Sequence, residues 1–148
     1  MIKYDIYFDG ACRNVKGSRN EPFGVGVAVF SNEVDYLEDF SKHIHYPSGG
    51  TNNIAEWEAF KQALLVCNDL RDITILMGYE CKFTIFSDSE IVVNQFYGKY
   101  QIREESFQKY YDECKELFDY LQISELKHIL RHLNTKADEL SKLGLQNK

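Results

Sequence analysis

Apolar and polar side chains alternate over residues 2–9, which predicts a strand with one buried face. A second strand is predicted over residues 23–31, where glycines among the valines weaken the strand or let another backbone come close. A third strand, of mixed character, is predicted over residues 34–45 and ends at the Pro-Ser-Gly-Gly stretch 47–50. Because the connections are short, we expect these three strands to be antiparallel.

The longest helical pattern covers residues 51–70. Small residues recur at every fourth position on its predicted buried side, at Ala55, Ala59, Ala63 and Cys67. Residues 69–82 are ambiguous, because the apolar run within them either extends this helix or forms a separate piece that stops at Gly78. A fourth strand is predicted over residues 83–87.

The rest of the chain predicts three more helices and one more strand. The helices cover residues 89–97, 104–121 and 135–145, and the strand covers residues 123–130. The element order is β-β-β-α-β-α-α-β-α, and a strand–helix–strand crossover should be parallel and right-handed. The pattern therefore predicts an α/β fold with a mixed five-stranded sheet and helices packed on it. The 148 residues suit a single domain, 1–148, that buries a core rich in aromatic residues.

Acidic residues stand where two of the predicted strands end. Asp9 ends the first predicted strand and precedes Gly10, and Asp88 follows the fourth predicted strand. Open α/β sheets tend to place their sites at the carboxyl ends of strands. The alternative interpretations are turn chemistry for Asp9 and helix capping for Asp88.

Two further acids, Glu56 and Asp138, are expected in the first turns of helices, where the helix dipole alone would favour them. Glu56 shares the apolar side of its helix, where an unpaired carboxylate is costly, whereas nothing forces Glu58 inward. Two strand ends and two helix starts can meet at one sheet edge. Four carboxylates gathered there would repel one another unless a cation intervened, and oxygen ligands without His or Cys suit Mg²⁺ or Mn²⁺.

Four short blocks of sequence carry a family resemblance. They read Tyr-Phe-Asp-Gly-Ala-Cys at 7–12, Thr-Asn-Asn-Ile-Ala-Glu-Trp-Glu-Ala at 51–59, Phe-Ser-Asp-Ser at 86–89 and Asn-Thr-Lys-Ala-Asp-Glu-Leu-Ser at 134–141. In this order they resemble the type 1 branch of the ribonuclease H family, in its compact form without a basic protrusion. The resemblance spans residues 2–145 and implies the ribonuclease H-like form of the mixed sheet.

The resemblance implies a metal-dependent endonuclease that hydrolyses the RNA strand of RNA/DNA hybrids and leaves 5′-phosphate and 3′-hydroxyl ends. It assigns both catalysis and metal binding to four acids, with two Mg²⁺ or Mn²⁺ ions per site when substrate is bound: Asp9, Glu56, Asp88 and Asp138. Glu58 and Glu139 neighbour these acids without matching the family pattern, and we expect them to be surface acids.

The same resemblance implies contacts with the substrate. The backbone of Gly10, Ala11 and Cys12, together with Asn52, would contact the minor groove of the hybrid, where the 2′-hydroxyl distinguishes RNA from DNA. Thr51 and Asn14 would help to hold a phosphate of the DNA strand, although simple helix capping also explains Thr51 and Asn52. Arg131 or His132 would assist product release or contact phosphate, and a plain surface histidine is the alternative for His132.

The chain departs from the family pattern in four places. Residues 13–17 lack the usual Gly-Asn-Pro-Gly loop, which weakens the match of Asn14, and Glu90 stands where many relatives have Gln. Residues 69–82 have the character of an insertion. The short link 98–103 leaves no room for the basic helix with which some bacterial relatives grip their substrate.

Net charge is −6, which is unusual for a protein that binds nucleic acid. Without the four proposed ligand acids, 19 acidic residues oppose 17 basic ones, so the rest of the molecule is nearly neutral and should bind a polyanion weakly and in a salt-sensitive way. No signal peptide or membrane-spanning run is visible, and the cysteines lack metal-ligand spacing. We expect reduced thiols, a cytoplasmic location, a monomer and no membrane partner.

Two other functions remain compatible with the sequence. The first is a catalytically weak or inactive module that keeps the fold and binds nucleic acid or protein. The second is a related DNA-processing nuclease or integrase. Retention of all four acids argues against the first, and the Thr-Asn-Asn and Asn-x-x-Ala-Asp blocks argue against the second.

Overall fold

A five-stranded sheet forms the centre of the computed structural model, which describes residues 1–13 and 15–146. The strands lie side by side in the order β3-β2-β1-β4-β5. β1 pairs antiparallel with β2 and parallel with β4, so the predicted mixed sheet is confirmed. The strand bounds are Ile2–Cys12 for β1, Glu21–Ser31 for β2, Lys42–Gly50 for β3, Cys81–Ser87 for β4 and Glu125–His128 for β5.

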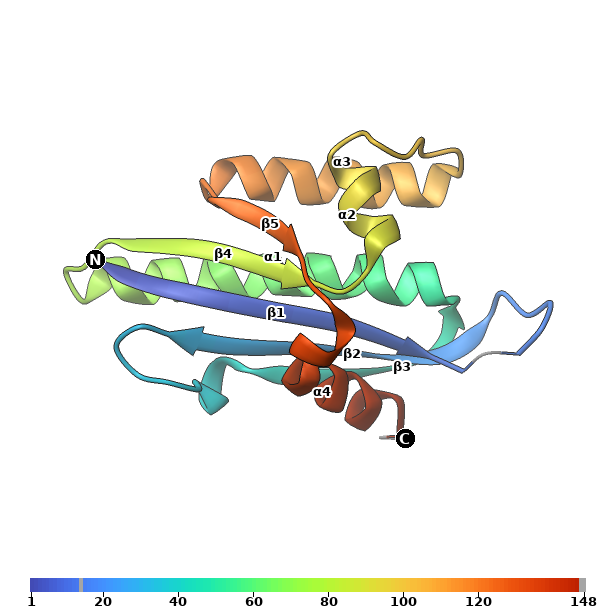
Figure 1. Ribbon diagram of the computed structural model, residues 1–148, viewed down its shortest axis with the longest axis horizontal. Helices are drawn as coiled ribbons and strands as arrows, with labels where there is room; N and C mark the ends of the chain where they lie inside the picture. The colour runs from blue at the N-terminus through green and yellow to red at the C-terminus, as the bar shows by residue number, and fades with distance from the viewer. Residues whose placement is uncertain (14, 147–148) are drawn as a thin grey trace.

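Helices cover both faces of this sheet (Figure 1). α1 packs on one face together with α2 and α3, and α4 lies on the other face over β1, β2 and β3. The helix bounds are Asn52–Leu76 for α1, Glu90–Phe96 for α2, Glu105–Tyr120 for α3 and Thr135–Gln146 for α4. Two 3₁₀ turns, Glu38–Phe40 and Arg131–Leu133, complete the described structure.

The ambiguous segment 69–82 belongs mostly to α1. The helix continues to Leu76, and Gly78 follows it with a φ of 85°, a left-handed conformation that glycine adopts readily. The hydroxyl groups of Tyr4 on β1 and Thr74 on α1 share a hydrogen bond of 2.7 Å inside the core. This bond joins the extended end of the helix to the sheet.

The predicted third strand is present, but its predicted bounds, residues 34–45, are wrong. Val34 is exposed, a 3₁₀ turn follows it, and the strand runs instead over Lys42–Gly50, through Pro47. β3 is an edge strand, and its pairing with β2 shifts register next to this proline. Proline is tolerated there because an edge strand or a bulge does not need its missing N–H. The predicted fifth strand, 123–130, is likewise shorter, at Glu125–His128.

Aromatic side chains fill the space between α1 and the sheet, as the composition predicts. Trp57, Phe60 and Phe8 are fully buried. Phe8 stacks on Phe60 with ring centroids 5.3 Å apart, and Phe96 of α2 meets the edge of Phe60 at 5.2 Å. No described helix is long and apolar enough to cross a membrane.

Glycines on the opposite face let α4 rest directly on β2. A Cβ at Gly26 would lie only 2.5 Å from the Ala137 carbonyl oxygen, and one at Gly24 would collide with the backbone at the end of α4. The sequence raised close backbone approach as one explanation of these glycines, and the structure confirms it.

Candidate active site

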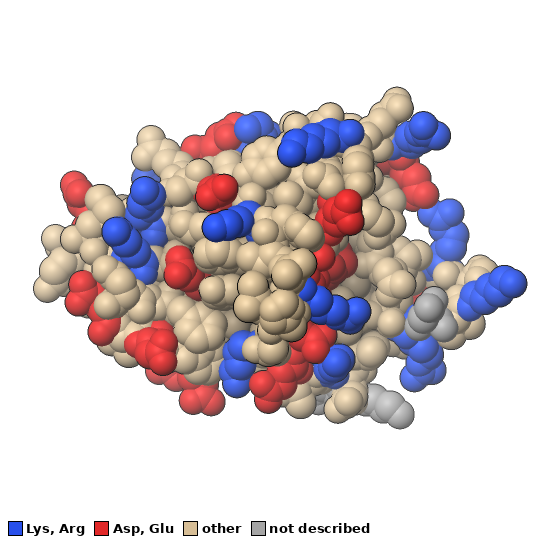
Figure 2. All heavy atoms as spheres, in the orientation of Figure 1, with Lys and Arg blue, Asp and Glu red and all other residues tan. Residues whose placement is uncertain are grey.

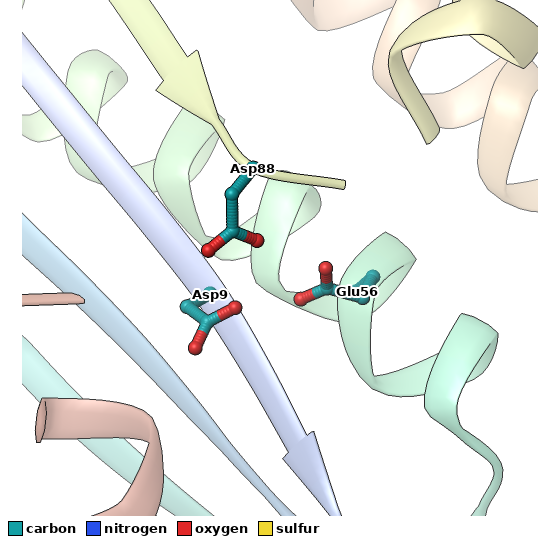
Figure 3. Close-up of side chains that lie close together, drawn as sticks. All are labelled: Asp9, Glu56 and Asp88. Carbon is teal, nitrogen blue, oxygen red and sulfur yellow. The ribbon is translucent and has the colours of Figure 1, made fainter. Parts of the chain in front are cut away.

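Three carboxylates from distant parts of the chain converge at one end of the sheet. Asp9 lies on β1, Glu56 on α1 and Asp88 directly after β4. One oxygen of each lies within 4.8 Å of those of the other two, and the side chains point toward one another (Figure 3). The structure therefore brings together three of the four acids that the sequence singled out.

Strand register places the two aspartates side by side. Phe8 of β1 pairs in parallel with Ser87 of β4, so the next residues, Asp9 and Asp88, lie at the same level of the sheet. β4 ends before Asp88, whereas β1 continues to Cys12, so the predicted strand end at Asp9 and turn at Gly10 are wrong. The helix cap that could have explained Asp88 falls on Ser89 instead, whose hydroxyl accepts a hydrogen bond from the Val92 N–H at 3.2 Å.

A close contact between α1 and β1 places Glu56. A Cβ at Gly10 would lie 2.7 Å from the Glu56 backbone nitrogen and closer still to the Ala55 carbonyl group, so only glycine allows this approach. The Gly10 N–H donates to Glu56 Oε1. Thr51 caps α1, and Glu56 lies beyond the first turn, so the dipole explanation proposed for this acid does not apply.

Burial raises the pKa of all three carboxyls, and repulsion within the cluster raises the pKa of Asp9 and Glu56 further. Burial and then the charge of Asp88 raise the pKa of Asp9 to about 7. Burial and then Asp9 raise the pKa of Glu56, and burial raises that of Asp88. One oxygen of Asp88, Oδ2, is buried without a hydrogen-bond partner. Such a cluster is unfavourable when fully ionised and is the kind of site that a hard divalent cation stabilises.

Asp138 stands beside this cluster but outside it. It lies in the first turn of α4, and its carboxylate pairs with Lys142 Nζ at 2.9 Å. Partial burial would raise the pKa of Asp138, but the ion pair with Lys142 and interaction with Asp9 hold it below the usual value. The fourth acid is thus near Asp9, and the first-turn dipole also explains its position.

Sequence reasoning missed two polar residues that hold Asp9 and its strand. Ser141 of α4 is completely buried and donates its hydroxyl hydrogen to Asp9 Oδ2 at 3.0 Å. Asn134, also buried, donates from Nδ2 to the Phe8 carbonyl at 2.9 Å. The helical spacing of small residues at Ala137, Ser141 and Gly144 was the available signal, because it marks a helix face that approaches another backbone closely.

The predicted substrate residues lie around the acids in two groups. A hollow of about 210 Å³ is lined by residues at the end of β1 and the start of α1, among them Cys12, Arg13, Lys16, Thr51 and Asn52. Gly10 and Ala11 precede this hollow on β1, and Asn14 lies outside the described residues. Thr51 also caps α1, which confirms the capping explanation without excluding substrate contact.

Arg131 and His132 form the second group, in the exposed 3₁₀ turn before α4. The positive charge of Arg131 opposes the rise in the pKa of Asp88 and contributes to the lowered pKa of Asp138, so Arg131 lies near both acids. Figure 2 shows further Lys and Arg side chains gathered over the connection between β1 and β2, at the right of the view. Basic groups therefore lie on two sides of the acidic centre.

Comparison with known proteins agrees with this arrangement. The family described as reverse transcriptase-like matches residues 8–144. RNase H1 from the halophilic archaeon Halobacterium salinarum NRC-1 has the same fold, with 23% identity, a TM-score of 0.81 and 99% of each chain covered. LC11-RNase H1, isolated from compost by a metagenomic approach, is 26% identical, with a TM-score of 0.81 and 97% of this chain and 96% of that chain covered.

A second structure of LC11-RNase H1 is a complex with an RNA/DNA hybrid. Its protein chain is 25% identical to this one, with a TM-score of 0.78, and the match covers 97% of this chain and 96% of that chain. The match over residues 8–144 shows that the chain belongs to the reverse transcriptase-like family. Within that family it is a ribonuclease H enzyme.

Proposed function

We propose that this enzyme cuts the RNA strand of RNA/DNA hybrids internally, with two divalent metal ions, and leaves 5′-phosphate and 3′-hydroxyl ends. The observation that carries the proposal is the convergence of Asp9, Glu56 and Asp88 within 4.8 Å. The hybrid in the LC11-RNase H1 complex supports the choice of substrate.

The donor set fits Mg²⁺ or Mn²⁺. The cluster offers carboxylate oxygens only, and the unpartnered Oδ2 of Asp88 leaves one buried acceptor free for a cation. Asp9, Glu56 and Asp88 would hold the ions, with Asp138 as a fourth ligand once its carboxylate leaves Lys142. Held by these carboxylates, two ions would supply Lewis acidity to activate a water molecule and to stabilise the leaving oxygen in an in-line attack on phosphate.

The chain's own basic and polar residues would orient the hybrid. The hollow lined by Cys12, Thr51 and Asn52 lies beside Gly10, whose N–H already holds Glu56, so a strand bound there passes next to the acids. Arg13 and Lys16, which line the same hollow, supply positive charge for a phosphate. Arg131, in the turn before α4, would contact a phosphate near Asp88, with His132 next to it.

We also infer that the enzyme acts as a monomer in the cytoplasm. All three clustered carboxylates come from one chain, so a second copy is not required to complete the cluster. The four cysteines are free, in agreement with the expectation of reduced thiols.

Cleavage of end-labelled substrates tests the proposal directly. RNA/DNA hybrid, duplex RNA and duplex DNA are each incubated with Mg²⁺, Mn²⁺ or EDTA, with wild-type protein and with Asp88→Asn. The matched control is Glu139→Gln, because Glu139 is an exposed acid adjacent to Asp138. We expect metal-dependent cutting of the hybrid's RNA strand alone, lost in Asp88→Asn and kept in Glu139→Gln.

Other outcomes would point to the alternative functions. Cutting of duplex DNA would identify a DNA-processing nuclease. Magnesium binding by well-folded protein without cutting of any substrate would identify a non-catalytic binding module. Cutting that survives in Asp88→Asn would show that the carboxylate cluster is not the active site.

A further inference from the structure

The Ser141 hydroxyl lies between two acceptors at the edge of the active site. It donates to Asp9 Oδ2 at 3.0 Å, and the Asp138 carbonyl oxygen lies at 2.8 Å. A hydroxyl has one hydrogen, and a carboxylate is a stronger acceptor than a carbonyl. The bond to Asp9 is therefore favoured whenever Asp9 is ionised.

Backbone packing leaves Ser141 little freedom to move away. Gly26 on β2 is the register partner of Asp9, and a Cβ at Gly26 would lie 2.5 Å from the Ser141 backbone nitrogen. α4 thus rests on β2 at the residue that pairs with Asp9. At the start of the same helix, Asn134 holds the Phe8 carbonyl, the residue before Asp9. The serine and the aspartate are fixed relative to each other by backbone on both sides.

The Asp9 carboxylate has two oxygens with different surroundings. Figure 3 shows one of them directed toward Glu56 and the other directed away from both neighbouring acids. Ser141 holds Oδ2. Because a carboxylate turns about a single bond with a broad energy minimum, a hydrogen bond to one oxygen is what selects the plane of the group.

We propose that Ser141 is a positioning residue that fixes the Asp9 carboxylate in the orientation that binds a divalent cation with Glu56 and Asp88. The inference rests on the proposed function, in which Asp9 is a metal ligand. Partners of metal ligands orient the ligand, and their loss typically lowers metal affinity by about 10- to 100-fold. Ser141 itself contacts neither substrate nor metal in this role.

Metal binding in the absence of substrate tests the inference. Mn²⁺ binding to wild-type protein, Ser141→Ala and Ser141→Cys is measured by isothermal titration calorimetry. We expect the affinity of Ser141→Ala to fall by about 10- to 100-fold. Ser141→Cys should lie between, because its thiol is of similar size but donates weakly. Ser106→Ala, which changes an exposed serine of α3, should bind Mn²⁺ like the wild type.

Hybrid cleavage provides a second readout. The Mg²⁺ concentration that gives half-maximal activity should rise by the same factor in Ser141→Ala, while KM for the hybrid at saturating Mg²⁺ stays unchanged. A purely structural defect would instead lower thermal stability and activity together at every metal concentration. Circular dichroism checks that each variant keeps the helix content of the wild type, and if Ser141→Ala unfolds, Ser141→Cys decides the question alone.

Two results would overturn the inference, and they are distinguishable. Wild-type affinity for Mn²⁺ in the folded serine variants would remove Ser141 from metal positioning and leave the proposed function intact. Failure of the wild-type protein to bind Mn²⁺ and to cut hybrid would remove the proposed function and this inference with it.

Discussion

Tyr110 on α3 donates its hydroxyl hydrogen to the Glu58 carboxylate on α1, across 2.9 Å. Tyr46 from β3 donates to the same carboxylate at 3.1 Å, and Gln62 Nε2 does so at 2.8 Å. Glu58 is half-buried, so the expectation that it is a simple surface acid is wrong, whereas Glu139 is exposed as expected. Glu58 joins a strand and two helices close to the start of α1, which also carries Glu56.

Substitution of Glu58 should therefore affect stability and leave chemistry intact. Hydrogen bonds to a charged group contribute about 1.5–3 kcal/mol, and Gln keeps one acceptor oxygen, so Glu58→Gln should lower the free energy of unfolding by about 1–3 kcal/mol. Urea unfolding measures this, with Glu139→Gln as the control that changes stability by less than about 0.5 kcal/mol. Loss of kcat in folded Glu58→Gln would instead assign Glu58 a role in the site.

Removal of one clustered charge should abolish activity without weakening the fold. Asp9→Asn removes repulsion with Asp88 and the cost of burying a charge, so the free energy of unfolding of the metal-free protein should stay the same or rise at neutral pH. Hybrid cleavage should disappear.

Added Mg²⁺ should raise the melting temperature of the wild type more than that of Asp9→Asn, because the variant lacks one ligand. An equal rise in both proteins would mean that Asp9 does not bind the metal.

Stability of the metal-free protein should fall as pH rises from about 4 to about 7. Burial and the charge of Asp88 raise the pKa of Asp9 to about 7, whereas an aspartate in the unfolded chain titrates near 3.9. The folded state then binds more protons than the unfolded state between these two pH values. The stabilising contribution of protonated Asp9 is therefore complete below about pH 4 and is lost as the pH rises through about 7. Urea unfolding in EDTA at several pH values measures the slope, which should be smaller in Asp9→Asn. Mg²⁺ should offset the loss increasingly as pH rises.

Gly10→Ala should damage both the fold and the site. The new methyl group would meet the backbone of Ala55 and Glu56, and overpacking of this kind costs about 1–3 kcal/mol. Displacement of α1 would also stretch the bond from Gly10 to Glu56, so kcat should fall. Gly78→Ala is the matched control, because Gly78 has a φ of 85° but open space around it, so backbone strain appears without a clash. Full activity in folded Gly10→Ala would show that this contact does not place Glu56.

Affinity for the hybrid should fall as the salt concentration rises, and Arg13 and Lys16 should account for part of this salt dependence. Each phosphate contact removed should lower the slope of log affinity against log salt by about 1, so Arg13→Ala and Lys16→Ala should each do so. Lys115→Ala is the control, because Lys115 pairs with Asp119 within α3. A slope that is unchanged in both loop variants would exclude phosphate contacts from this loop.

The clustered acids could be predicted because their placement depends on local pattern and on strand pairing. The apolar run of β4 ends before Asp88, and parallel pairing with β1 brings Asp9 level with it, although β1 continues past Asp9 to Cys12. The alternatives of capping and dipole effects could be decided only by geometry: Ser89 is the cap of α2, and Glu56 lies past the first turn of α1.

The features that the sequence did not reveal depend on distances between elements. Nothing local to Glu58 indicates that Tyr46 and Tyr110 will reach it, since these residues lie on β3 and α3. The bounds of the third strand were wrong for two reasons. Val34 favours a strand but is exposed and lies before β3. Pro47 is typical of a strand end, but it lies inside β3, where an edge position and a register shift tolerate it. The relation of Asp138 to the cluster depends on its partner Lys142, one helical turn away.

The central position of β1 has a consequence for the order in which the protein becomes active. β1 is synthesised before the other strands of the sheet, and its neighbour β4 and the helix that carries Ser141 and Asp138 come much later in the chain. Pairings between distant segments form slowly and require those segments to be present. A nascent chain on the ribosome therefore holds Asp9 without the partners that orient it, and nuclease activity should emerge only after α4 has left the exit tunnel.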